Sequence, residues 1–201
     1  MNNILVLFAH PRYEESRINQ ALVSKIQSVE RVTFHDLYEE YPDFNIDVAY
    51  EKKLLQKHEV VVWQHPLYWY SCPPLMKQWI DVVLEYGWAY GAGGKALAGK
   101  QCLSAITAGG SLEVYCSSGR NIYSINEFLR PFEQTARLCG MNYLPPFVVT
   151  GTYRLSDERL QEYASQYAAA LELMKHNLSV AQAENCDFLN DIPQLSKLAA
   201  R

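Results

Sequence analysis

The chain has 201 residues, of which 49% are hydrophobic, so it can bury one sizeable core and form one or at most two domains. Its 18 Lys and Arg against 22 Asp and Glu give a net charge of −4, and no basic cluster offers the footprint of a nucleic-acid-binding protein. No apolar run approaches the roughly 20 residues that cross a bilayer, and residues 1–10 lack the charged region of a signal peptide.

The number and spacing of the cysteines indicate the redox compartment of the protein. The five cysteines are odd in number and widely scattered, and none forms a CxxC pair. This pattern is typical of free thiols in a reducing cytosol and argues against a disulfide framework or a structural zinc site. We therefore expect a cytoplasmic protein that binds no metal.

The first part of the chain predicts strands and helices in alternation. Residues 4–9 form a short apolar run, typical of a buried strand. Ser16 is a suitable N-cap for a helix, because Ile18, Leu22, Val23 and Ile26 follow with helical spacing. A shorter strand nearer an edge is predicted for residues 32–37, and a helix for residues 50–57.

Residues 60–74 are the most informative stretch. Residues 60–65 are apolar and rich in β-branched and aromatic types, which predicts a third buried strand. The loop that follows has tyrosines on both sides of Trp69, and Pro74 can open a helix over residues 75–84. A strand that delivers aromatic rings and free backbone groups to a sheet edge suits a flat aromatic cofactor. An ordinary buried strand with a Pro-rich turn is the alternative.

The remaining elements repeat the alternation. A fourth strand is predicted for residues 102–107, a helix for 125–138, an edge strand with a proline pair for 143–149, and a long helix after Ser156. Strands alternating with helices predict an α/β protein with a doubly wound, mostly parallel five-stranded sheet. We expect residues 1–175 to form one domain, and residues 176–201 to be a tail that is irregular or docked on a partner subunit.

In an open parallel sheet, ligands bind beyond the carboxyl ends of the strands. Three loops lead there: residues 10–19, whose helix start suits a phosphate, residues 67–70, and residues 107–111 with paired glycines. No GxGxxG or P-loop is present, so a Rossmann dinucleotide site is not supported. Taken singly, Ser16 is explained as a helix cap, the glycines as a turn, and Tyr115 as one of fourteen tyrosines.

Several ordered motifs make these loops more specific. They are Ala9-His10-Pro11, residues 41–47, residues 63–71, residues 77–81, residues 87–91, residues 129–132 and Cys139-Gly140. With them the chain resembles, over residues 4–174, the NAD(P)H:quinone oxidoreductase family of flavodoxin-like flavoproteins. It is most similar to the small bacterial members, the ancillary proteins of glutathione-regulated potassium efflux systems. The resemblance implies a flavodoxin-like fold with strand order 2-1-3-4-5 and helices on both faces.

The resemblance also implies site residues. In the family, the residues that correspond to His10, Ser16, Arg17, Ile18 and Asn19 hold the flavin phosphate. A segment similar to Leu67, Tyr68, Trp69 and Tyr70 lines the isoalloxazine, and the family's Thr-Thr-Gly-Gly is here Thr107, Ala108, Gly109 and Gly110. Tyr115 aligns with a tyrosine that hydrogen-bonds the flavin in the larger members. Those members have a histidine six residues later, where this chain has Asn121, so the resemblance does not imply a full charge relay here.

The implied activity is hydride transfer from NADPH or NADH to a quinone or similar electrophile, through FMN or alternatively FAD, by a ping-pong mechanism. The implied assembly is a homodimer, because residues 41–44 and 88–90 would otherwise be exposed apolar surface. A second implied role is a regulatory subunit that activates a potassium–proton antiporter at the inner face of the membrane. A one-electron flavodoxin carrier fits less well, since such carriers are more acidic and have a Thr- and Gly-rich phosphate turn.

Overall fold

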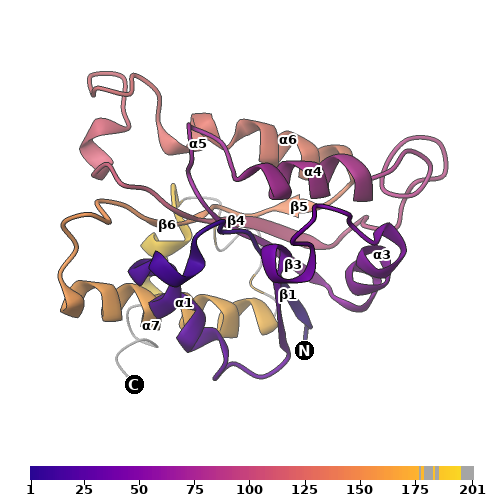
Figure 1. Ribbon diagram of the computed structural model, residues 1–201, viewed down its shortest axis with the longest axis horizontal. Helices are drawn as coiled ribbons and strands as arrows, with labels where there is room; N and C mark the ends of the chain where they lie inside the picture. Colours follow the sequence, from indigo (N-terminus) through magenta and orange to yellow (C-terminus); the bar gives the residue numbers. More distant parts are fainter. Residues whose placement is uncertain (177, 179–182, 184–185, 196–201) are drawn as a thin grey trace.

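The computed structural model describes residues 1–176, 178, 183 and 186–195. A parallel sheet runs through the middle of the molecule and helices cover both of its faces (Figure 1). The strands are β1 (Ile4–Phe8), β2 (Val32–Asp36), β3 (Val60–Pro66), β4 (Gln101–Thr107), β5 (Asn142–Tyr143) and β6 (Phe147–Val149). The helices are α1 (Arg17–Ile26), α2 (Leu37–Glu40), α3 (Val48–Lys57), α4 (Pro74–Val83), α5 (Ile125–Phe128), α6 (Arg130–Leu138) and α7 (Asp157–Lys175).

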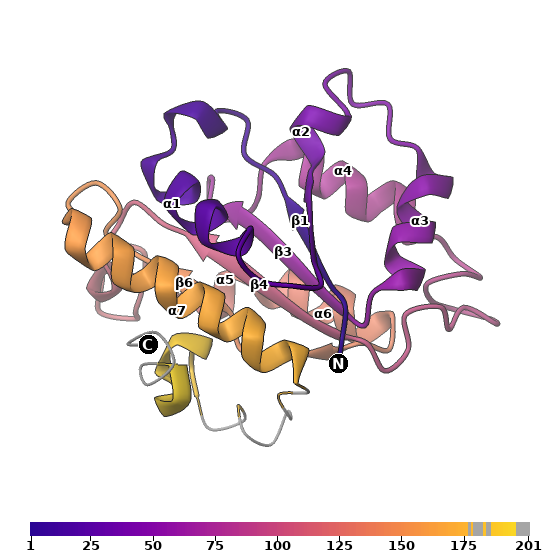
Figure 2. The same ribbon diagram turned by 90° about the horizontal axis from the view of Figure 1, so that it is seen from below.

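The strand order is β2-β1-β3-β4-β5, which confirms the predicted order 2-1-3-4-5 and the flavodoxin-like fold. Alternate residues of the central strands face opposite layers. Val60 and Val62 of β3 pack in one core with α1 and α7, whereas Val61 and Trp63 pack in a second core with α4 and α6. Figure 2 shows α1 and α7 side by side on their face of the sheet.

Two predicted elements are interrupted by proline. The single helix expected over residues 125–138 is wrong: α5 ends at Phe128, and α6 starts at Arg130 with a proline in its first turn. Pro131 has no N–H and would clash with the carbonyl one turn before it, so an unbroken helix is disfavoured. The strand expected over residues 143–149 is likewise two short strands, β5 and β6, on either side of Pro145 and Pro146. Both pair in parallel with β4, at the predicted edge of the sheet.

The described part of the tail covers that edge. The Leu189 N–H donates to the Pro146 carbonyl at 2.9 Å. The Asn190 side chain bonds both the N–H and the carbonyl of Val148, at 2.8 and 3.1 Å. Leu189, Ile192 and Leu195 are buried in the core beside α7. Unpaired edge groups of β6 are therefore covered from within the chain. The remainder of the predicted tail, residues 177, 179–182, 184–185 and 196–201, lies outside the described residues.

The five cysteines are free thiols, as the sequence predicts: Cys72, Cys102, Cys116, Cys139 and Cys186. Among the described residues, no helix combines the length and the apolar character needed to span a bilayer.

Candidate functional site

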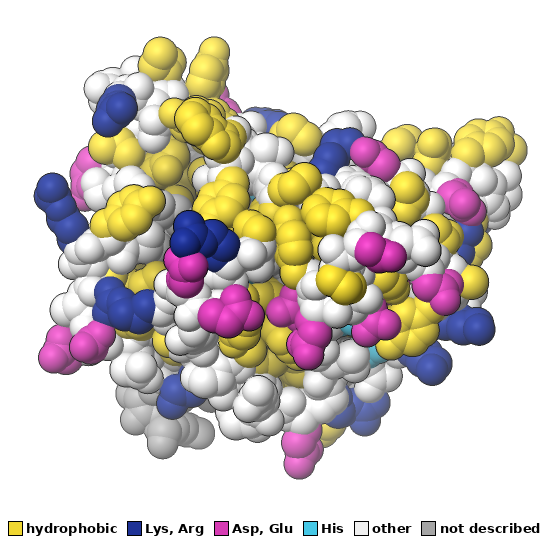
Figure 3. All heavy atoms as spheres, in the orientation of Figure 1, with side chains coloured by type: hydrophobic (Ala, Val, Ile, Leu, Met, Phe, Trp, Pro, Cys, Tyr) yellow, Lys and Arg dark blue, Asp and Glu magenta, His cyan; other side chains and the backbone are white. Residues whose placement is uncertain are grey.

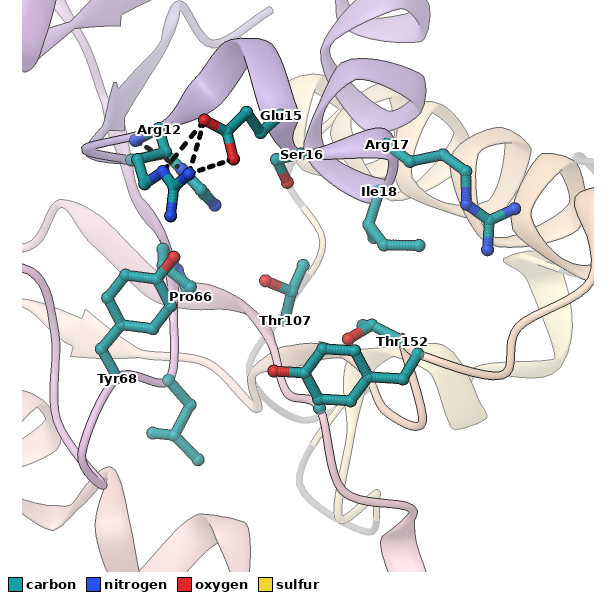
Figure 4. A pocket seen from close by; sticks show the side chains of 13 residues that line it. Arg12, Glu15, Ser16, Arg17, Ile18, Pro66, Tyr68, Thr107 and Thr152 are labelled. Atoms are coloured by element: carbon teal, nitrogen blue, oxygen red, sulfur yellow. Dashed lines mark hydrogen bonds and ion pairs between the residues drawn. The ribbon is translucent and has the colours of Figure 1, made fainter.

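A cavity of about 340 Å³ opens at the carboxyl ends of β1, β3 and β4, where the sequence places the site (Figure 4). The loops after β1, β3, β4 and β6 meet there. The lining residues are His10, Arg12, Glu15, Ser16, Arg17, Ile18, Pro66, Leu67, Tyr68, Thr107, Gly109, Thr152 and Tyr153. Three of the four loops are the ones that the sequence selects, and the fourth follows the last strand.

The amino end of α1 forms one wall. Ser16 is its N-cap, and Ser16 Oγ accepts a hydrogen bond from the backbone N–H of Asn19 at 3.3 Å. The backbone N–H groups of the first helical residues have no partner within a helix, and the dipole makes this end positive. Both Arg17 and Ile18 line the cavity. The wall therefore suits an anionic group.

The two arginines of this loop have different roles. The Arg17 side chain points away from the cavity toward α7 (Figure 4), where it bonds Asp157 and the Leu155 carbonyl, each at 2.5 Å. Arg17 therefore offers the cavity its backbone rather than its guanidinium. Arg12 lies at the opposite side of the opening and pairs with Glu15. This pair is largely exposed, so solvent screens it.

His10 lines the cavity between the first two loops. It is nearly buried, its Nδ1 accepts from the Arg12 N–H at 3.2 Å, and its ring lies 5.8 Å from that of Tyr68 in an edge-on arrangement. Burial lowers the pKa of His10 from its ordinary value, although Glu14 acts in the opposite direction. A neutral ring that accepts at Nδ1 carries its proton on Nε2. His10 is therefore a neutral hydrogen-bond donor at this position.

The second loop has an unusual backbone. The Leu67 N–H donates to the Thr107 carbonyl at 2.8 Å, which ties this loop to the next one. Trp69 and Tyr70 have φ angles of 49° and 62°, and the Ser71 N–H closes the turn on the Tyr68 carbonyl at 3.0 Å. A bulky residue with a positive φ angle costs about 1–3 kcal/mol of conformational strain, and such strain is concentrated at functional sites. Trp69 is 92% exposed, so the turn presents its indole to solvent.

The third loop begins after Thr107, the last residue of β4, and is hydrogen-bonded at two positions to the chain around the end of β6. The Ala108 N–H donates to the Val149 carbonyl at 2.8 Å, and the Gly151 N–H donates to the Gly110 carbonyl at 2.8 Å. A Cβ on Gly109 would lie 2.3 Å from the ring of Tyr153, so a larger residue there would displace this exposed ring from its present position. The glycine allows the loops after β4 and β6 to approach closely at the cavity wall.

Tyr115 lies beside this loop rather than in the cavity lining. It is buried, and its ring packs against Gly110 and, edge-on, against Phe128 at 6.3 Å. Burial raises the pKa of Tyr115, while a hydrogen bond from the Gly110 backbone acts against that shift. Asn121, which stands where the larger family members have histidine, accepts from the Tyr70 hydroxyl at 3.3 Å. The 67–70 turn is thus in direct contact with the segment between β4 and α5.

The structure brings most of the predicted residues to one place. Asn19, Trp69, Tyr70, Ala108, Gly110 and Tyr115 lie behind or beside the cavity rather than on its surface. Sequence reasoning missed Thr152 and Tyr153, although the loop after the last parallel strand must reach the same edge. It also missed Arg12 and Glu15, because nothing in their local pattern distinguishes them from a solvated loop.

The aromatic segments expected at a subunit interface differ from the prediction. Tyr41 and Ala89 are buried within the chain, and Trp88 is half-buried beneath Lys52. Residues 41–44 and 88–90 are therefore not simply exposed apolar surface, because α3 and α4 already cover much of them. Other aromatic side chains are exposed instead, among them Trp69, Tyr86 and Tyr153.

A family model described as a flavodoxin-like fold matches residues 2–171. The chain belongs to this flavodoxin-like family. Within the family it is 46% identical over 169 residues to the glutathione-regulated potassium-efflux system ancillary protein KefG of Yersinia enterocolitica, covering 84% of this chain and 92% of that protein. It is 45% identical over 169 residues to general stress protein 14 of Bacillus subtilis, covering 84% of this chain and 97% of that one.

Solved flavodoxin-like structures agree. General stress protein 14 of Treponema denticola, in complex with FMN, superposes with a TM-score of 0.82 at 41% identity, covering 86% of this chain and 99% of that one. An NADPH-quinone reductase from P. pentosaceus superposes with a TM-score of 0.76 at 30% identity, covering 83% and 95%. These similarities confirm the family expected from the motifs.

Proposed function

We propose that the chain is an FMN-dependent oxidoreductase that passes hydride from NADPH or NADH to a quinone or a similar electrophile. The observation that carries the proposal is the cavity at the amino end of α1, where backbone N–H groups and the hydroxyls of Ser16 and Thr107 face one space. That donor set suits a phosphate. The FMN complex of a 41% identical neighbour supports FMN, with FAD as the alternative.

Each wall would hold a different part of the cofactor. The phosphate would lie against Ser16, the backbone of Arg17 and Ile18, and His10, whose neutral ring donates without adding charge. The isoalloxazine would lie between the 67–70 turn and the 107–110 loop. FMN, when bound, supplies the hydride chemistry, while the protein supplies orientation and electrostatics. Tyr115 would donate a hydrogen bond toward the negative charge that develops there.

Tyr68 and Trp69 of the 67–70 turn are exposed, so the side of this space that the turn forms is open to solvent. We propose that NAD(P)H and the acceptor occupy this open side in turn, which gives ping-pong kinetics. Initial rates at several quinone concentrations would then give parallel double-reciprocal lines. Intersecting lines would contradict the shared position.

A matched pair of variants tests the phosphate placement. Ser16 and Ser156 are both helix N-caps whose Oγ accepts from the N–H three residues later at 3.3 Å, but only Ser16 lines the cavity. Each change to Ala removes one cap, which costs about 1 kcal/mol of stability. Ser16→Ala is expected to weaken FMN retention on gel filtration, and Ser156→Ala is not. Equal retention in both variants would contradict the placement, and absence of flavin in the purified wild-type protein would contradict the function.

We also propose a homodimer. Hydrophobic side chains gather on the face of the molecule that carries α4 and α5 (Figure 3), and Tyr70, Tyr86, Ile122 and Tyr123 are exposed. Monomers rarely leave such patches uncovered. Light scattering is expected to report about twice the 23.0 kDa of the chain. An active species with the mass of one chain would contradict the dimer.

A second role is favoured by the 46% identity to a KefG protein, whose name makes it ancillary to a potassium-efflux system. We propose that the chain works in the cytoplasm and also docks on such an antiporter at the inner face of the membrane. Purifying a tagged antiporter from membranes that contain the chain tests this. Potassium efflux that is the same with and without the chain would contradict a regulatory role.

A further inference from the structure

Behind the cavity, a series of buried side chains leads from α7, by way of β3 on the sheet face that α1 and α7 share, to the start of α1. The Tyr167 hydroxyl donates to Gln64 Oε1 at 3.0 Å, and Gln64 Nε2 donates to Asn19 Oδ1 at 3.3 Å. Asn19 Nδ2 then donates to Ser16 Oγ at 3.0 Å and to Thr107 Oγ1 at 3.4 Å. Tyr167, Gln64 and Asn19 have at most 1% of their surface exposed, and only Ser16 and Thr107 line the cavity.

All of these hydrogen bonds run in the same direction, with each donor on the side away from the cavity. The Tyr167 hydroxyl sets that direction, because its hydrogen needs an acceptor and Gln64 Oε1 is the one that the described structure supplies. Burial raises the pKa of Tyr167, so the hydroxyl keeps its proton. If the series were reversed, the Gln64 side-chain N–H groups would point at the Tyr167 hydroxyl. The buried hydroxyl hydrogen of Tyr167 would then have no acceptor, which is costly.

The direction decides what the cavity can bind. Ser16 Oγ accepts from both the backbone N–H and the Nδ2 of Asn19, which occupies its two lone pairs. Thr107 Oγ1 also accepts from Asn19. Ser16 is therefore left with its hydrogen alone to offer a ligand, and Thr107 with its hydrogen and one lone pair. Two such donors beside the positive end of α1 favour an oxygen that only accepts, as in an ionised phosphate monoester.

We propose that Tyr167, Gln64 and Asn19 are positioning residues that hold the Ser16 and Thr107 hydroxyls as donors and so make the cavity selective for a phosphate monoester. The inference rests on the proposed flavin function and deepens it. It also assigns Asn19 a role different from direct phosphate contact, because its carboxamide lies behind the cavity and both of its side-chain N–H groups already donate to Ser16 and Thr107.

FMN and riboflavin separate this role from simple packing, because they differ in the phosphate alone. Tyr167→Phe keeps the ring and removes the donor that sets the direction. In fluorescence titrations of flavin-free protein, we expect Tyr167→Phe to lower FMN affinity about tenfold and to leave riboflavin affinity unchanged. Tyr143→Phe is the matched control, since its hydroxyl bonds Ser104 instead and does not reach the cavity. It is expected to leave both affinities unchanged.

Gln64→Glu provides a second variant with the same side-chain length. A carboxylate at this position accepts from Tyr167 and from Asn19, which turns the Asn19 amide and directs its oxygen at Ser16 and Thr107. The two hydroxyls would then donate inward, so the loss of FMN affinity is expected to exceed that of Tyr167→Phe, again without loss of riboflavin affinity. If Tyr167→Phe does not fold, Gln64→Glu allows the same comparison of FMN affinity with riboflavin affinity.

Equal losses of FMN and riboflavin affinity would show that these residues only maintain packing, and would overturn the proposal, as would unchanged FMN affinity. Calorimetric titration with inorganic phosphate separates the proposal from the flavin function. Phosphate binding that is present in the wild type and weakened in Tyr167→Phe supports the proposal even if the wild type binds no flavin. Wild-type protein that binds neither phosphate nor flavin overturns both.

Discussion

Tyr115 is the residue for which the structure allows the cleanest substitution. Its ring packs on Gly110 and Phe128, and these contacts survive when only the hydroxyl is removed. If the hydroxyl stabilises charge on the reduced flavin, Tyr115→Phe loses one hydrogen bond to a charged group, worth roughly 1.5–3 kcal/mol. We expect flavin reduction by NADPH or NADH to slow about ten- to hundredfold, with flavin affinity nearly constant. Stopped-flow absorbance measures the rate of reduction, and a fluorescence titration of flavin-free protein measures the affinity.

Tyr123→Phe is the control, because Tyr123 also contacts Phe128 edge-on, at 5.9 Å, but is exposed. It is expected to reduce flavin at the wild-type rate. Wild-type rates in Tyr115→Phe as well would mean that Tyr115 serves packing alone. Asn121, the neighbour that departs from the family pattern, is bonded to Tyr70 and so contributes to the shape of the 67–70 turn.

A buried carboxylate connects several elements on the α3 and α4 side of the sheet. Glu51 of α3 is fully buried, and its two oxygens accept from the Tyr41 hydroxyl at 2.6 Å, from His35 Nε2 at 2.7 Å and from Trp79 Nε1 at 2.7 Å. The three donors belong to β2, to the segment after α2 and to α4. Each would be buried without a partner if the carboxylate were removed.

Glu51→Ala is therefore expected to lower the free energy of unfolding by about 3–5 kcal/mol, because orphaned buried donors and a cavity remain. Urea unfolding followed by circular dichroism measures the change. Glu162→Ala is the control, since Glu162 pairs with Arg159 on an exposed face of α7 and its loss changes stability little. A small effect of Glu51→Ala would mean that solvent replaces the carboxylate.

Sequence reasoning worked where one local rule decides an element. The buried strands, the Ser16 cap and the meeting of the loops at the carboxyl edge follow from apolar patterning, capping chemistry and sheet topology. It failed where two rules compete, as at Pro131, which lies within a helical pattern but cannot continue it. It could not predict the positive φ angles of Trp69 and Tyr70, because no glycine marks the turn. The series from Tyr167 to Asn19 joins residues more than 100 positions apart, and no local pattern reveals it.

For the molecule as a whole, the sheet edge at β6 is covered by the chain's own described tail residues. Pro145 and Pro146 interrupt the last strand, and Asn190 then pairs with the backbone of β6 in place of a further strand. The family model ends at residue 171, so this cover lies beyond the part of the chain that the model matches. The strand that it covers, β6, leads directly into the loop that carries the lining residues Thr152 and Tyr153.

The stability of the whole molecule is expected to depend on pH through His65. This residue is fully buried, stacks on Phe132 at 5.1 Å and donates from Nδ1 to the Pro66 carbonyl. Its Nε2 has no hydrogen-bond partner among the described residues. Burial lowers the pKa of His65 to about 4, against about 6.5 in an unfolded chain. Between these values the unfolded state binds a proton that the folded state does not, so stability falls as the pH is lowered from 6.5 toward 4.

At 1.36 kcal/mol for each pKa unit, this single group accounts for a loss of up to about 3 kcal/mol over that interval. His65→Asn removes the titrating ring but keeps an N–H near the position of Nδ1, so its stability is expected to fall less steeply on acidification. Part of the slope remains, because burial also lowers the pKa of His10. Urea unfolding of both proteins at pH 7.5, 6.0 and 5.0 measures the difference. Identical slopes would mean that His65 becomes protonated in the folded protein at its ordinary pKa, which requires water to reach its Nε2 through the packing around Phe132.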